Sequence, residues 1–97
     1  MADYILSNEA EADLDSILDY IAADSIQSAL NVHDRFLEVF RMLGENPNVG
    51  HYREDLASRA VRFFPVYSFM IVYLSDSNPV EVARIFGAAQ DVESVLK

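Results

Sequence analysis

Six consecutive apolar residues in the last third of the chain, Phe-Met-Ile-Val-Tyr-Leu at 69–74, constrain its fold more than any other feature. Successive side chains of a β-strand point to opposite faces of a sheet. One face would therefore carry Phe69, Ile71 and Tyr73, and the other Met70, Val72 and Leu74. A strand of an antiparallel sheet that is covered on one face alternates apolar with polar residues. This run therefore predicts a central strand whose two faces are both covered.

Two amphipathic helices are expected before this strand. Ser7 or Asn8 offers an N-cap for the first helix, whose apolar stripe consists of Ala10, Leu14, Ile17, Leu18 and Ile21. The motif Asp24-Ser25-Ile26-Gln27 resembles a capping box that opens a second helix, which extends to about Glu45. The expected buried side of this helix comprises Ile26, Ala29, Leu30, Phe36, Leu37, Phe40 and Leu43, widened by Val32 and Val39. The short connection between the helices favours an antiparallel helical hairpin.

The remaining segments predict strands and turns. Strands are expected at residues 2–6, 60–65, 68–74 and 80–86, with a single helical turn at Asp55 to Ser58. Asn46-Pro47 should end the second helix, because the residue before a proline avoids the helical conformation. We therefore predict one α+β domain over residues 1–97, with an N-terminal strand and a helical hairpin packed on one face of a small antiparallel sheet. The second apolar face is left for a partner or for a C-terminal segment.

Composition and charge exclude several classes of function. The formal net charge is −9 and lysine occurs once, as the last residue, so we expect no direct nucleic-acid binding. No apolar run approaches the ~20 residues that span a bilayer, and neither a signal segment nor a cysteine is present, which predicts a cytoplasmic protein without a membrane anchor. Glu11, Asp15 and Asp19 form an acidic row on the first helix, which is either a solvated face or a surface for a basic partner segment.

Residues that commonly carry catalysis are scarce. The chain has no cysteine nucleophile, serine elbow, phosphate loop or zinc spacing, so we expect no catalytic residue, metal or cofactor. His33 is expected in the core, and His51 on the surface. Four arginines could converge where the loop meets the sheet: Arg53, Arg59, Arg62 and Arg84. They would either contact an anionic partner or pair internally with Glu54, Asp55, Asp91 or Glu93.

The order of the motifs resembles the ParE branch of the RelE/ParE superfamily of bacterial toxins. The resemblance rests on four segments: Leu6-Ser7-x-x-Ala10-x-x-Asp13-Leu14-x-x-Ile17-x-x-Tyr20-Ile21, Asn46-Pro47-x-x-Gly50-x-x-Arg53-x-Asp55-Leu56, Arg62-Phe63-Phe64-Pro65-Val66 with Ile71-Val72-Tyr73, and Arg84-Ile85-Phe86-Gly87-Ala88-Ala89-Gln90-Asp91. It implies a toxin bound in a hetero-oligomer by a ParD-like antitoxin that has a ribbon-helix-helix domain. The implied target is DNA gyrase, which such toxins inhibit without catalysis.

Two alternatives remain within this resemblance. A RelE-like toxin would cleave ribosome-bound mRNA, for which Arg62, Arg84 and His51 would have to serve. The family often carries histidine just before the final-strand glycine, where this chain has Phe86, and that departure favours a noncatalytic inhibitor. The other alternative is a toxin-like fold retained only to bind an antitoxin. The candidate partner-binding residues are Arg53, Arg59, Arg62, Arg84, Phe69, Met70, Tyr73 and Phe86.

Overall fold

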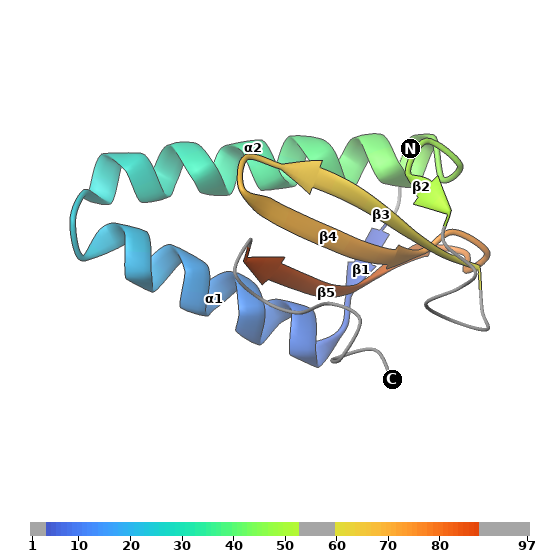
Figure 1. The fold of residues 1–97 in the computed structure, drawn as a ribbon, viewed down its shortest axis with the longest axis horizontal. Coiled ribbons are helices and arrows are strands. Elements are labelled where there is room, and N and C mark those ends of the chain that lie inside the picture. The colour runs from blue at the N-terminus through green and yellow to red at the C-terminus, as the bar shows by residue number, and fades with distance from the viewer. Residues whose placement is uncertain (1–3, 53–59, 88–97) are drawn as a thin grey trace.

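A computed structural model describes residues 4–52 and 60–87 (Figure 1). Two helices and five strands follow one another in the order β1 (Tyr4–Leu6), α1 (Asn8–Ala22), α2 (Ile26–Glu45), β2 (His51–Tyr52), β3 (Val61–Val66), β4 (Phe69–Leu74) and β5 (Val80–Gly87). The helices form an antiparallel hairpin on one face of the sheet, as predicted. No helix in the described ranges is long and apolar enough to cross a membrane.

Each helix begins at a serine. The hydroxyl of Ser7 accepts a hydrogen bond from the N–H of Ala10, and that of Ser25 accepts one from the N–H of Ser28. The second helix therefore starts one residue later than the expected capping box, and its third residue is a serine that cannot complete such a box. Asn46 ends α2, as the following proline predicts.

The sheet has the strand order β1-β5-β4-β3-β2 and is not wholly antiparallel. β1 pairs in parallel with β5, with Tyr4 opposite Val80, because the helical hairpin and the other strands intervene between them in the chain. The other neighbouring pairs are antiparallel. The two-residue strand β2 was not expected, since no strand was predicted between the second helix and residue 60. The expected helical turn at residues 55–58 lies outside the described residues.

Both faces of β4 are apolar and packed, as the sequence predicts. The face toward the helices contributes Ile71 and Tyr73 to the main core. In the same core the ring centres of Phe36 and Phe40 lie 5.8 Å apart. The opposite face carries a second cluster, which we call the apolar sheet face: Val61, Phe63, Val72 and Phe86 are buried, with Met70 and Leu74 partly buried against them. The C-terminal segment considered as a cover for this face falls outside the described residues.

The start of α2 departs from the expected burial. Ile26 is 71% exposed and Leu30 is 53% exposed, so their prediction as core residues was wrong. The physical reason is the length of the hairpin, which extends beyond the end of the sheet in Figure 1. Phe36 contacts Phe69 at the start of β4, and the first turns of α2 lie beside α1 beyond the end of the sheet (Figure 1).

Candidate functional site

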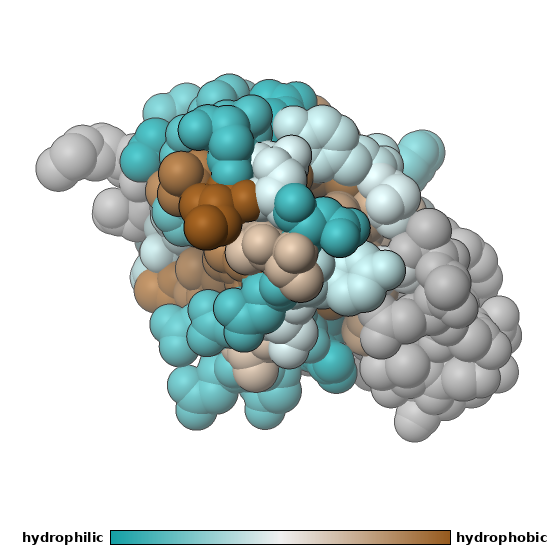
Figure 2. All heavy atoms as spheres, turned by 90° about the vertical axis from the view of Figure 1, so that its left-hand side faces the viewer, coloured by the Kyte–Doolittle hydropathy of each residue, from teal (hydrophilic) through white to brown (hydrophobic). Residues whose placement is uncertain are grey.

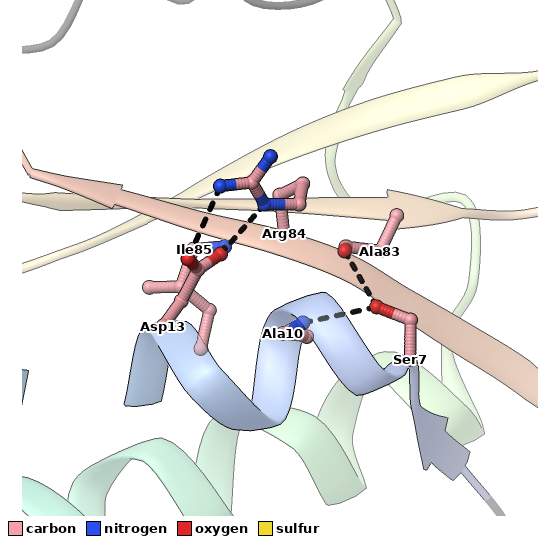
Figure 3. A network of polar contacts seen from close by, with 6 residues as sticks. All are labelled: Ser7, Ala10, Asp13, Ala83, Arg84 and Ile85. Carbon is pink, nitrogen blue, oxygen red and sulfur yellow. Dashed lines mark hydrogen bonds and ion pairs between the residues drawn. The ribbon is translucent and has the colours of Figure 1, made fainter. Parts of the chain in front are cut away.

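A polar network joins the first helix to the open edge of the last strand (Figure 3). β1 ends at Leu6, opposite Val82, so within the described residues the following backbone groups of β5 have no strand partner on that side. Ser7, which follows β1, continues the hydrogen bonding to β5. Its N–H donates to the carbonyl of Val82 at 3.0 Å, and its hydroxyl donates to the carbonyl of Ala83 at 2.7 Å. The first turn of α1 thus continues the hydrogen bonding of the sheet edge.

Asp13 completes this network. Its carboxylate accepts hydrogen bonds from the backbone N–H of Ile85 at 2.9 Å and from Nε and Nη2 of Arg84 at 2.8 and 3.2 Å. A bidentate pair of this kind is stronger and more directional than a single contact. The hydrogen bond to Asp13 is the main cause that raises the pKa of Arg84 above its ordinary value, against an opposing effect of burial. The guanidinium group of Arg84 is therefore charged, and its two hydrogen bonds to Asp13 fix its position.

The guanidinium of Arg84 also reaches the apolar sheet face. It lies 4.9 Å from the centre of the Phe86 ring, in cation–π geometry. Phe86 itself is fully buried. Asp13 was missed as the partner of Arg84, although a carboxylate on the flank of an apolar helical stripe, three residues after Ala10, was an available signal.

A second network holds the loop after α2. The hydroxyl of Tyr73 donates to the carbonyl of Pro47 at 2.7 Å and accepts from the N–H of Gly50 at 2.8 Å. Arg62 donates to the carbonyl of Gly50 at 2.9 Å and lies 5.4 Å from the centre of the Tyr52 ring. Burial raises the pKa of Tyr73, against smaller lowering effects from the Gly50 hydrogen bond and the Arg62 charge.

Arg62 and Arg84 do not converge. Arg62 lies opposite Tyr73, which faces the helices, and Arg84 lies opposite Val72, which faces the other way. Directly paired residues present their side chains on the same face, so the two arginines leave the sheet from opposite faces. They also stand on β3 and β5, which β4 separates. The expected arginine cluster is therefore wrong for these two residues, and Arg53 and Arg59 lie outside the described residues.

The four aromatic and apolar residues predicted to bind a partner differ in their burial. Tyr73 and Phe86 are buried, and the Tyr73 hydroxyl bonds within the chain, whereas Phe69 and Met70 are partly exposed at the start of β4. His33 is not a core residue, because its side chain is 41% exposed and lies 3.8 Å from Asp34. His51 is exposed on β2, as expected for a surface residue. A contact of any of these residues with a partner stays a prediction.

Comparisons with known proteins agree with this architecture. The family model described as "ParE toxin of type II toxin-antitoxin system, parDE" matches residues 4–92. A solved structure described as "Chromosomal ParDE TA system from P. aeruginosa" is 23% identical in sequence and superimposes with a TM-score of 0.72, covering 90% of this chain and 96% of that chain. At that identity the likeness shows a common fold. No curated protein matches this chain significantly. Because the family model spans nearly all of the sequence, the chain belongs to the ParE toxin family of type II toxin–antitoxin systems.

Proposed function

We propose that this protein is a toxin that inhibits DNA gyrase by protein–protein contact and catalyses no reaction itself. Its family membership supports the role of a toxin. The observation that argues most against a ribonuclease is the separation of Arg62 from Arg84. Cleavage of RNA needs basic and proton-transfer groups around one phosphate. These two arginines leave opposite faces of the sheet and are held by Gly50 and Asp13.

The residues next to Arg84 and the overall charge support the same proposal. Phe86 contacts Arg84 and supplies an apolar ring, which can neither donate nor accept a proton. The net charge of −9 opposes docking on ribosomal RNA, whose affinity for proteins comes largely from lysine and arginine on phosphates. A protein target in the cytoplasm is compatible with both features.

We propose further that a ParD-like antitoxin with a ribbon-helix-helix domain neutralises the toxin in a hetero-oligomer. The apolar sheet face supports this, because Met70 and Leu74 are partly exposed beside its buried members. An extended antitoxin segment that packs along β4 would bury both side chains. The Met70→Asp variant should bind the antitoxin encoded by the adjacent gene at least tenfold more weakly, since a carboxylate would be desolvated there.

A supercoiling assay with purified gyrase tests the main proposal. The chain should inhibit supercoiling in a dose-dependent manner, and the antitoxin should restore the activity when added in equal amounts. A parallel reaction with translating ribosomes should leave the mRNA intact. Supercoiling that is unaffected at a large molar excess of folded toxin would refute the proposal, as would translation-dependent mRNA cleavage that is lost with Arg62→Ala and Arg84→Ala.

A further inference from the structure

The turn between β3 and β4 has a tyrosine at a position that favours glycine. Val66 and Phe69 form the last pair of the two strands, so the turn consists of Tyr67 and Ser68 alone. Two-residue turns of this kind need a positive φ at their first residue, which glycine, asparagine and aspartate adopt most easily. Tyr67 has a φ of 55°, and in the described ranges no other residue has a positive φ. A bulky side chain in this left-handed region strains the backbone, so Tyr67 lowers the stability of the turn.

The side chain of Tyr67 does not offset this strain through polar or ring contacts with the rest of the chain. It is 67% exposed. Among the described residues, none forms a hydrogen bond, an ion pair or a ring contact with it. A strained residue that gains so little from the folded monomer points to a role in binding, because function is the usual reason why a protein keeps a destabilising residue.

The β3–β4 turn lies at one end of the sheet. Phe69, the residue after the turn, is opposite Gly87, so the turn stands beside the end of β5 (Figure 1). Figure 2 faces this end of the molecule and shows hydrophobic and intermediate side chains between hydrophilic ones. Tyr67 does not line the groove between α1 and α2, and it belongs to neither of the two apolar clusters that pack on the sheet. The turn is therefore a surface of its own.

The surroundings of Tyr67 are uncharged. Residues 63–75 contain no charged side chain, although the chain has a net charge of −9. Pro65 and Ser68 beside it are exposed. A surface without charge neither attracts phosphates nor selects a basic peptide, and it is suited to an uncharged pocket of another protein. Tyrosine commonly fills such pockets, since it is enriched among the residues that contribute most to protein–protein affinity.

We propose that Tyr67 anchors the toxin to the protein that it inhibits, by inserting its ring into an uncharged pocket of that target. This inference rests on the proposed function, because it assigns the target contact of the same toxin. The two-residue turn between paired strands fixes the position of the ring, so little conformational freedom is lost on binding. Burial of the ring in the complex then offsets the strain that the free toxin carries.

Substitutions at position 67 test this proposal, because they should change stability and inhibition in opposite directions. Tyr67→Gly relieves the strain and removes the ring, so it should raise the denaturation midpoint of the toxin and weaken inhibition of gyrase supercoiling at least tenfold. Tyr67→Asn, which also tolerates a positive φ, should act in the same way. Tyr67→Phe keeps the ring and the strain, so its midpoint should match the wild type and its inhibition should stay within about threefold. Tyr20→Ala is the matched control, because Tyr20 is 82% exposed on α1, and it should leave inhibition unchanged.

Growth arrest of cells that express the toxin without antitoxin separates this inference from the proposed function. If the wild type inhibits gyrase and Tyr67→Gly inhibits it equally, the role of Tyr67 is refuted and the gyrase proposal stands. If the wild type arrests growth but does not inhibit gyrase, the gyrase proposal fails, and the growth arrest should still be weakened by Tyr67→Gly and kept by Tyr67→Phe. A wild type that neither inhibits gyrase nor arrests growth would overturn both proposals.

Three further measurements exclude other roles for the ring. The affinity of Tyr67→Gly for the antitoxin should stay within about twofold of the wild type, and a tenfold loss would make the ring an antitoxin contact and overturn the proposal. A glycine variant that is less stable than the wild type would show that the ring supports the fold, with the same consequence. A dimer in sedimentation that Tyr67→Gly converts to monomer would assign the ring to self-association instead.

Discussion

The hydroxyl of Tyr73, in the middle of the sheet, accepts a hydrogen bond at 2.8 Å from the backbone N–H of Gly50, in the loop that follows α2. The same hydroxyl donates to the carbonyl of Pro47, so one buried side chain forms hydrogen bonds with two backbone groups of that loop. Twenty-three residues separate the two partners in the chain. A tyrosine in an apolar strand thus serves as the polar anchor of the connection between the helices and the sheet.

Tyr73→Phe should lower the free energy of unfolding by about 1–3 kcal/mol, because it leaves a backbone donor and acceptor of the loop without their partner. Chemical denaturation followed by circular dichroism measures this change. Tyr20→Phe is the control, since Tyr20 is largely exposed, and its effect should stay within about 0.5 kcal/mol. Equal stabilities of the Tyr73 variant and the wild type would show that the hydroxyl anchors nothing.

Stability should also fall in alkaline solution because of Tyr73. Burial raises its pKa in the folded state above the ordinary value of 10.0, so the unfolded chain loses this proton first. The contribution is fully present below pH 10 and is lost as the pH rises from there through the folded-state pKa. The stability difference between wild type and Tyr73→Phe should therefore shrink above that pH. A difference that stays constant into strongly alkaline solution would contradict this linkage.

Gly50→Ala should destabilise the fold by about 1–3 kcal/mol through overpacking. A Cβ atom at this position would lie 2.6 Å from the Tyr73 hydroxyl oxygen and 2.8 Å from the backbone oxygen of Phe63. Adding Tyr73→Phe removes the clash with the hydroxyl oxygen but keeps those with the Phe63 oxygen and with the ring carbon Cε1, also at 2.8 Å, so the double variant should be somewhat more stable than the sum of the single effects predicts. Gly44→Ala within α2 is the control, and helix propensity predicts a gain of up to about 1 kcal/mol there. Strict additivity in thermal or chemical unfolding would argue against the contact.

Asp13→Ala should cost about 2 kcal/mol, since it removes the acceptor of both Arg84 and the N–H of Ile85. Asp13→Asn keeps one acceptor oxygen and should recover part of this loss. The N–H of Ile85 should exchange with solvent faster in Asp13→Ala than in Asp13→Asn, as measured by hydrogen exchange. Asp15→Ala, at an exposed position on the same helix, is the matched control and should leave this exchange rate unchanged. An unaltered rate in Asp13→Ala would refute the role of Asp13 at the strand edge.

The sequence predicted those features that depend on near neighbours in the chain. Ser7 was one of two candidate caps for α1, Asn46-Pro47 marked the end of α2, and the alternation from Phe69 to Leu74 predicted a strand packed on both faces. Caps and side-chain periodicity are set within about four residues, and therefore they are visible in the sequence. The motif order also led to the correct family.

The sequence by itself determined the helical hairpin, the three main strands and the apolar character of both sheet faces, because each follows from local spacing. Only the tertiary structure decided that β1 joins β5 in parallel, that Arg84 pairs with Asp13 across 71 residues, and that Arg62 and Arg84 leave opposite faces. It also decided that Ile26 and Leu30 remain exposed. These outcomes depend on strand order, on register and on where the sheet ends beneath the hairpin, and such long-range relations leave no periodic trace in the sequence.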